Sequence, residues 1–255
     1  MKFCLLASGS KGNSLWVEEG PTAFLVDNGL SLSDFMGRAR ARGLNTAMLK
    51  SVFVTHEHTD HINGVGRLAK TLNLEVYASP VLMREKGDRL GAVRCKPISE
   101  GDEVAVGTVK VRAIKSSHDT VDPLIYLIKA PKATLGIATD LGEAAPEVIR
   151  HFQGLDAIIL EFNHDTKMLF EGTYPGFLKK RVSGNRGHLS NDQAAEFLSQ
   201  VTHQGLKVVV LAHLSENNNS PELAYKAATG CLGKCAGKPA IHVAQQDHPT
   251  DVFDL

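Results

Sequence analysis

Apolar residues in the first half of the chain fall in short runs that are separated by glycine, proline and polar turn residues. The runs KFCLLA, SLWVEE and TAFLVD open the chain and predict an antiparallel meander of strands. Later runs predict strands at SVFVT and LEVYA, and two hairpins formed by DEVAVG with TVKVRAI and by LIYLIKA with ATLGIAT. Helical spacing predicts helices near residues 31–42, 65–72 and 81–88.

After Asp140 the pattern changes to an alternation of helices and strands. Strands are predicted at DAIILEF, KVVVLA and AIHVA, and helices begin at Pro146, Ser190 and Ser220. The sequence SNDQ is a capping box, and Ser220 stands before a proline that suits the first helical position. No repeat or linker divides the chain, so we predict a single domain over residues 1–255. Its fold class is α/β (α+β), a four-layer αββα sandwich of two mixed, mostly antiparallel sheets with helices outside.

The composition is that of an ordinary globular protein. The chain has 255 residues, of which 43% are hydrophobic, enough for a sizeable core. Lys plus Arg and Asp plus Glu both total 28, so a polyanion would have to bind at a local basic patch. The start MKFCLLASGS is too short for a signal-peptide core and no run reaches membrane-spanning length, so we expect a cytoplasmic protein without a membrane partner. Buried free thiols are expected at Cys4, Cys95, Cys231 and Cys235.

The segment THEHTDHINGV concentrates polar side chains directly after a predicted buried strand. It carries His56, His58, Asp60 and His61 within six residues. Extended spacing puts His56 and His58 on the same side of the chain, so both can reach one ion at about 2.0–2.1 Å. Asp60 and His61 fall on a tighter turn and can face a second ion. A solvated polar loop is the alternative, but imidazole and carboxylate together suit borderline divalent metals.

A second polar segment, KKRVSGNRGHLSNDQ, contains His188 just before the helix that begins at Ser190. The free N–H groups and the positive dipole end of a helix start favour anions. A basic cluster stands upstream and suits phosphate contacts: Lys179, Lys180, Arg181 and Arg186. A solvated helix face is the alternative for this cluster.

The pattern H-x-H-x-D-H resembles that of the metallo-β-lactamase superfamily, and the likeness continues in IKSSHDT, GIATDLG and VLAHLS. The resemblance implies a dinuclear metal centre and hydrolysis by attack of a metal-bridging hydroxide. By this resemblance, one ion would be bound by His56, His58 and His118 and the other by Asp60, His61 and His213, and Asp140 would bridge both. Asp27, at the end of TAFLVD, would orient the metal loop, unless it is a plain turn carboxylate.

Four further segments resemble the YycJ/WalJ-like bacterial metallohydrolases, which are regarded as DNA exonucleases: LLASGSKGNS, LEFNHD, YPGFLKKRVSGNRGHLSNDQAA and LAHLSENNNSPELA. The layout is also similar to tRNase Z and to a cyclic phosphodiesterase. The resemblance implies a phosphodiesterase with nucleic acid as its partner and with Asp60 and His188 as catalytic residues. His188 has no place in the ligand set, so it would act as general acid for the leaving oxygen or as a donor to a phosphate oxygen.

Several assignments stay open at this point. His and Asp ligands accept either Zn²⁺ or Mn²⁺. We expect Asn218 to contact substrate, unless it merely forms a turn with Asn217 and Asn219. We expect His164 to support the ligands or touch substrate, while Asp165 next to it can equally cap a helix. No aromatic series marks a base-stacking platform, since Trp16 stands alone. The alternatives to a nuclease are a lactonase or thioesterase, or a non-catalytic metal-binding regulatory protein; DNA versus RNA and the oligomeric state are undecided.

Overall fold

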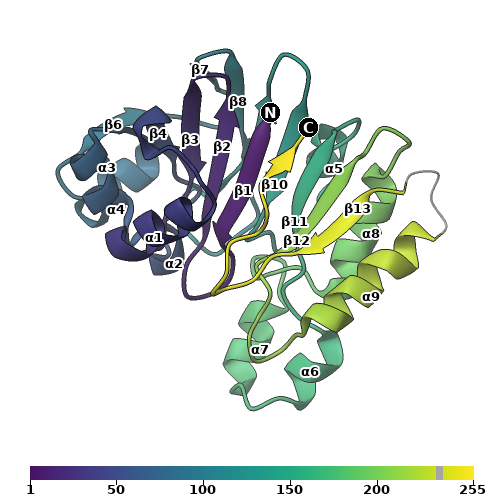
Figure 1. Cartoon of the computed structure of the whole chain (residues 1–255). Coiled ribbons are helices and arrows are strands. Elements are labelled where there is room, and N and C mark those ends of the chain that lie inside the picture. Colours follow the sequence, from purple (N-terminus) through teal and green to yellow (C-terminus); the bar gives the residue numbers. More distant parts are fainter. Residues whose placement is uncertain (234–237) are drawn as a thin grey trace. The chain divides into compact units, whose positions relative to one another are not determined.

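A computed structural model describes residues 1–233 and 238–255, and the described chain divides into two compact units. Unit 1 comprises Met1–Lys115, Thr120–Ala133 and Gln245–Leu255, and unit 2 comprises Ser116–Asp119 and Thr134–Ala244. Figure 1 labels the elements of both. The single domain inferred from the absence of a linker stays a prediction.

Unit 1 contains a seven-stranded sheet in the order β14-β1-β2-β3-β4-β5-β6. The pairs β1–β2 and β2–β3 are antiparallel, which confirms the predicted meander. The pairs β3–β4, β4–β5 and β5–β6 are parallel, and β14 adds an antiparallel pair to β1. The strands are β1 Lys2–Ala7, β2 Ser14–Glu19, β3 Thr22–Val26, β4 Leu49–Phe53, β5 Glu75–Ala78, β6 Arg94–Pro97 and β14 Phe253–Asp254.

The helices of unit 1 lie between these strands, and their apolar faces form a core with the sheet. They are α1 Leu32–Ala41, the 3-10 helix η1 Thr46–Met48, α2 Thr59–Ile62, α3 Val65–Leu72 and α4 Pro80–Leu90. Phe35, Leu68 and Leu82, one from each longer helix, are fully buried in one apolar cluster with the strand residues Val52 and Val76. The predicted helices are thus confirmed to within a residue or two.

Three more strands of unit 1 form an antiparallel ladder. They are β7 Glu103–Val106, β8 Val109–Lys115 and β9 Leu124–Lys129, with β7 paired to β8 and β8 to β9. Along β8 buried and exposed residues alternate, as expected for a sheet with one buried face. Gly107 has a φ of +62° in the turn between β7 and β8, which is the left-handed conformation that a tight hairpin needs.

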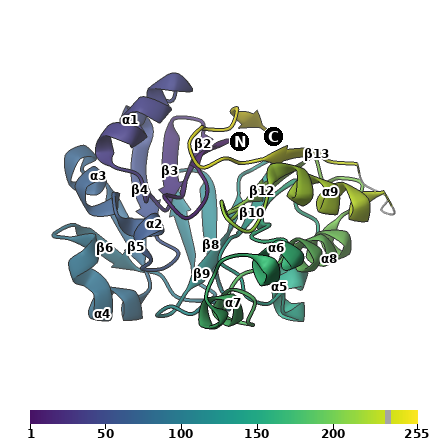
Figure 2. The ribbon, with the colours of Figure 1, turned by 90° about the horizontal axis from the view of Figure 1, so that it is seen from below.

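Unit 2 is built on parallel strands that alternate with helices. The pairs β10–β11, β11–β12 and β12–β13 are all parallel. Helix α8 packs on α9, and α9 packs on β13 (Figures 1 and 2). The elements are β10 Thr134–Ala138, α5 Pro146–His151, β11 Ala157–Glu161, α6 Thr166–Glu171, α7 Gly176–Val182, α8 Asn191–Val201, β12 Val208–Ala212, α9 Pro221–Leu232 and β13 Ala240–Val243.

Two sequence expectations need qualification. The mostly antiparallel arrangement holds for β1–β3 and β7–β9, but β3–β6 and β10–β13 pair in parallel, because helices that connect successive strands return the chain in the same direction. Of the predicted thiols, Cys4 is buried and Cys95 is half-buried, while Cys235 lies outside the described residues. Within 1–233 and 238–255, no helix is both long and apolar enough to span a bilayer.

Candidate metal centre

In unit 1 the polar loop after β4 brings two predicted ligands together. His56 is buried, and His58 is the N-cap of the short helix α2. The Nε2 atom of His56 and the Nδ1 atom of His58 lie 3.1 Å apart. Two nitrogens at about 2.1 Å from one tetrahedral ion are about 3.4 Å apart, so this spacing suits a shared ion.

Asp27 and Thr55 fix the orientation of two histidines of this loop. Asp27 Oδ2 accepts from His61 Nδ1 over 2.7 Å and from Thr55 Oγ1 over 2.7 Å, and its Oδ1 accepts from the Thr55 backbone N–H over 2.8 Å. Because Thr55 Oγ1 donates to Asp27, it can accept from His56 Nδ1 at 2.9 Å. Both imidazoles therefore carry hydrogen on Nδ1, which leaves the lone pair that a metal needs on Nε2.

Asn13, in the segment LLASGSKGNS, contacts the predicted ligands directly. Its Nδ2 lies 3.1 Å from Asp60 Oδ2 and 3.0 Å from His61 Nε2. Its backbone N–H donates to the Asp60 carbonyl over 2.7 Å. Gly29 packs so closely that a Cβ there would be 1.8 Å from the Asp60 carbonyl oxygen. The loop thus holds Asp60 by its backbone, and only the absence of a side chain at Gly29 permits this.

In unit 2 two of the predicted ligands stand at the ends of the parallel strands that flank β11. Asp140 follows β10 and His213 follows β12, and β11 pairs with both of these strands. The carboxyl ends of parallel strands meet at one edge of a sheet, so the two side chains approach each other. Both residues have a positive φ, +56° for Asp140 and +54° for His213. Such strain in non-glycine residues is typical of functional positions.

The ring nitrogens of His118 and His213 are arranged around the Asp140 carboxylate. His118 Nε2 lies 3.6 Å and His213 Nε2 lies 3.7 Å from Asp140 Oδ1. On the other side of each ring, His118 Nδ1 donates to the Gly187 carbonyl over 2.9 Å and His213 Nδ1 donates to Glu161 over 2.9 Å. These Nε2 distances exceed hydrogen-bond length but fit ligands that share one ion.

Glu161 organises this cluster, and sequence reasoning missed it. The side chain is fully buried at the end of β11. Its Oε1 accepts from His188 Nδ1 over 2.8 Å and from His213 Nδ1 over 2.9 Å, and its Oε2 accepts from the backbone N–H groups of Leu141 and Leu189 over 3.1 Å. The sequence did hold a signal for Glu161. It is a carboxylate at the end of an apolar strand, and that strand lies in the sequence between the strands that precede Asp140 and His213.

The environment of Glu161 favours its ionised form. Burial raises the pKa of the carboxyl, but the charge of His188 and the hydrogen bonds from His188 and His213 outweigh burial and lower the pKa to about 2. A carboxylate only accepts, so both histidines must donate from Nδ1. The His188 side chain is 19% exposed, whereas that of His213 is 6% exposed.

The donor set fits a divalent metal. One ligand atom from each of Asp140, Glu161, His188 and His213 lies within 4.8 Å of the others. Imidazole nitrogen with carboxylate oxygen suits zinc and manganese. Since Glu161 Oε1 already accepts two hydrogen bonds, we regard Glu161 as a residue that positions the histidines. Both His188 and His213 turn Nδ1 to Glu161, but they face Asp140 differently. The ring nitrogen that lies 3.7 Å from Asp140 Oδ1 is Nε2 in His213 and Nδ1 in His188.

The predicted substrate residues have varied surroundings. Lys179 Nζ donates to the Phe170 carbonyl over 2.7 Å, Arg181 pairs with Asp119, and Arg186 Nη2 donates to the His118 carbonyl over 3.3 Å. Lys180 is exposed. Asn218, by contrast, is 1% exposed and its Nδ2 points to Ser215 Oγ at 3.5 Å, which favours a structural role over the expected substrate contact.

His164 is buried within unit 2, and its carbonyl accepts from the Asn191 backbone N–H over 2.8 Å. Burial lowers the pKa of its imidazole to about 4. Its Nδ1 is enclosed without a hydrogen-bond partner among the described residues. Asp165 caps α6, as its Oδ1 accepts from the Met168 backbone N–H over 2.8 Å.

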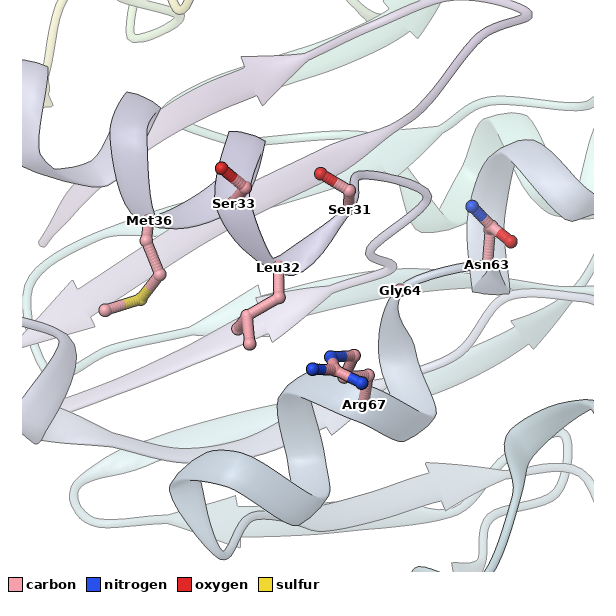
Figure 3. A pocket seen from close by; sticks show the side chains of 7 residues that line it. All are labelled: Ser31, Leu32, Ser33, Met36, Asn63, Gly64 and Arg67. Carbon is pink, nitrogen blue, oxygen red and sulfur yellow. The ribbon is translucent and has the colours of Figure 1, made fainter.

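A cavity of about 530 Å³ lies in unit 1 between the starts of α1 and α3 (Figure 3). Leu32 and Arg67 extend toward one another across it in Figure 3. None of the predicted metal ligands lines this cavity, although Asn63 and Gly64 in its wall directly follow the histidine loop. It is lined by Ser31, Leu32, Ser33, Met36, Asn63, Gly64 and Arg67.

Comparison with known proteins adds one family match and three similar proteins. The profile of the beta-lactamase superfamily domain matches residues 22–214. The chain is 35% identical to exodeoxyribonuclease YycJ of Bacillus anthracis, over 91% of this chain and 89% of that protein. The metallo-beta-lactamase fold protein YhfI of Bacillus subtilis is similar with a TM-score of 0.72 at 18% identity, covering 99% of both chains. Zn²⁺-bound PqqB of Methylobacterium extorquens is similar with a TM-score of 0.74 at 15% identity, covering 100% of both. The predicted α/β sandwich of two mixed sheets is confirmed.

Proposed function

The chain belongs to the beta-lactamase superfamily, and on this premise we propose that it is a metal-dependent phosphodiesterase that degrades DNA as an exonuclease. The likeness to an exodeoxyribonuclease over nearly the whole chain supports this substrate. The observation that carries the proposal is the surroundings of His188. Its Nδ1 is held by Glu161 at 2.8 Å, and its ring is partly exposed. A histidine held in this way can give a proton to a substrate oxygen.

We assign two divalent ions, Zn²⁺ or Mn²⁺, to the seven ligands that the family motif indicates. The fixed Nδ1–H groups of His56, His61, His118 and His213, described above, support this assignment. When bound, such ions supply Lewis acidity and a nucleophile at neutral pH. Asp60 takes part in catalysis as a ligand. The assigned ligands are His56, His58 and His118 for one ion, Asp60, His61 and His213 for the other, and Asp140 for both.

The protein side chains contribute positioning and proton transfer. Glu161 accepts a hydrogen bond from His188 Nδ1 and so orients the ring with Nε2 toward the reacting phosphodiester. There the Nε2–H group of His188 protonates the leaving oxygen or donates to a phosphate oxygen. The exposed Lys180 and the basic residues near it attract the DNA backbone. Action on DNA would take place in the cytoplasm.

An assay on labelled oligonucleotides tests the proposal. Protein loaded with Mn²⁺ or Zn²⁺ is expected to shorten DNA from an end in steps, and the product ladder on a gel gives the polarity. Bis-aryl phosphate serves as a small phosphodiester probe. Metal-loaded protein that cleaves DNA, RNA and bis-aryl phosphate no faster than metal-free protein would rule the proposal out.

The same preparation separates the alternatives. A lactonase or thioesterase would hydrolyse a carbon ester while leaving phosphodiesters intact, and it would depend little on His188 because its leaving group needs less protonation. A non-catalytic regulator would bind metal and hydrolyse neither class of substrate.

A further inference from the structure

We propose that the helical hairpin of α6 and α7, residues 166–182, binds a single-stranded stretch of DNA by stacking bases on Phe170 and Phe177. This inference specifies single-stranded rather than duplex DNA as the bound form, and it rests on the proposed function. Its evidence is a pair of exposed aromatic side chains, the charge around them and the way the hairpin is fastened to His188.

Phe170 and Phe177 are far more exposed than the other phenylalanine side chains of unit 2. Phe170 is 55% exposed and Phe177 is 75% exposed, whereas Phe152, Phe162 and Phe197 are completely buried. Burying a phenylalanine side chain is worth about 1.5–3 kcal/mol, so two exposed rings forgo a substantial stabilisation. Exposed apolar side chains that gather at one place mark a binding surface more often than isolated ones do.

The two rings belong to the same end of the hairpin. Phe170 is the last residue but one of α6, Phe177 is the second residue of α7, and only residues 171–176 separate them. Lys179 Nζ on α7 donates to the Phe170 carbonyl over 2.7 Å, which ties the two helices together. In Figures 1 and 2, α6 and α7 lie together beyond the strand ends of unit 2. The rings thus stand at the exposed tip of a fastened element.

The charge of the hairpin indicates a polyanion as the occupant. Residues 166–182 contain four basic side chains and one acidic side chain, although the whole chain has no net charge. Lys167 and Lys180 are exposed, as are the two rings. Aromatic faces next to cations are the usual way in which proteins bind single strands, since unpaired bases offer their faces and the backbone its phosphates. In a duplex those faces are already stacked.

The hairpin is connected at both ends to the residues that hold His188. It follows β11, which ends at Glu161, and α7 ends at Val182, whose carbonyl accepts from the His188 backbone N–H over 2.9 Å. A Cβ on Gly187 would lie 2.2 Å from the carbonyl oxygens of Arg181 and Val182, so only glycine allows this contact. A strand held on the hairpin is therefore held by the element that supports the proposed general acid.

Binding of a labelled oligothymidylate with phosphorothioate linkages to the metal-loaded protein tests the inference by fluorescence anisotropy. Phe170→Ala and Phe177→Ala should each raise the dissociation constant about 10-fold, as loss of one stacked base predicts. Phe177→Trp should retain the wild-type affinity, since a larger ring also stacks. Affinity for a blunt duplex should change far less than affinity for the single strand.

Tyr225→Ala is the matched control, because Tyr225 is 47% exposed on α9 of the same unit and lies outside the hairpin. It should bind as the wild type does. Unchanged single-strand affinity in both phenylalanine variants overturns the inference, as does an equal loss for duplex and single strand. Light scattering that shows self-association lost in the variants also overturns it, since the rings would then contact a second copy.

Cleavage of an unmodified oligonucleotide by the wild type separates the two proposals. Binding that depends on the phenylalanines without any cleavage supports the hairpin surface and removes the nuclease. Cleavage without such dependence keeps the nuclease and removes the surface.

Discussion

At the scale of single residues, His188 is the sharpest test of the chemistry. We predict that His188→Ala lowers the rate of phosphodiester cleavage by about 10²–10⁴-fold, the usual contribution of a general acid, while the metal content stays at the wild-type value. The rate is measured on labelled DNA and the metal by atomic emission. His151→Ala, a half-buried histidine on α5, is the control. A variant that loses one metal ion instead would show that His188 is a ligand.

Glu161 should act through the histidines that it holds. In the wild type, Glu161 Oε1 accepts from two histidine N–H groups and Oε2 accepts from two backbone N–H groups. Glu161→Gln keeps the shape of the side chain but replaces one of these acceptor oxygens with an NH₂ donor. Loss of a partner that orients a ligating histidine weakens metal binding about 10–100-fold, and we expect a change of this size. Competition with a coloured chelator measures it. Equal metal affinity in Glu161→Gln and in Glu147→Gln, an exposed control on α5, would contradict this role.

His164 should make the stability depend on pH. Burial lowers its pKa from 6.5 to about 4 in the folded chain. As the pH falls below 6.5, the imidazole of His164 becomes protonated in the unfolded chain but stays neutral in the folded chain. The free energy of unfolding therefore decreases between about pH 6.5 and 4, by about 3 kcal/mol in total. Urea unfolding of the wild type and His164→Gln across this window gives the difference. A difference in unfolding free energy that is constant with pH would contradict the expected titration.

At the scale of elements, the start of α8 fixes the segment that carries His188. Ser190 Oγ accepts from the Gln193 backbone N–H over 3.3 Å, and Gln193 Oε1 accepts from the Ser190 N–H over 2.9 Å. Ser190→Ala should lower the free energy of unfolding by about 1 kcal/mol, as loss of an N-cap does. Denaturant titration measures the loss, and Ser190→Thr should recover most of it. An alanine variant as stable as the wild type would mean that this cap contributes nothing.

The same scale shows why sequence patterns found some elements and missed others. The capping box at Ser190 and the Ser-Pro start of α9 are local chemistry and could be predicted residue by residue. Helices α2, α6 and α7 have four to seven residues, too few for an apolar periodicity to repeat. The sequence allows a cap at Asp165 and a helix face for the basic cluster as alternatives, but it predicts no helix there. The exposed phenylalanines of α6 and α7 therefore carried no signal before the fold was known.

At the scale of the whole molecule, contacts between residues far apart in the chain could not be predicted from sequence patterns. The H-x-H-x-D-H spacing predicted a metal loop, and the likeness of GIATDLG and VLAHLS predicted ligands at Asp140 and His213, because these motifs are local in the sequence. That Glu161 holds His188 and His213 depends on the parallel pairing of β11 with β12 and on the return of the chain after α7. Likewise Asn13 contacts Asp60 and His61 across 47 and 48 residues.

Metal binding should stabilise the folded chain, because the proposed ligands are brought together only by folding. A ligand that binds only the folded state stabilises it by about 2.7 kcal/mol at 100 times its dissociation constant. We predict that EDTA lowers the midpoint of thermal unfolding and that Zn²⁺ or Mn²⁺ restores it. Calorimetry measures the difference in transition midpoint between the metal-free and the metal-loaded protein. His213→Ala should abolish most of the metal-induced shift, whereas an equal shift in this variant would contradict the assigned ligand set.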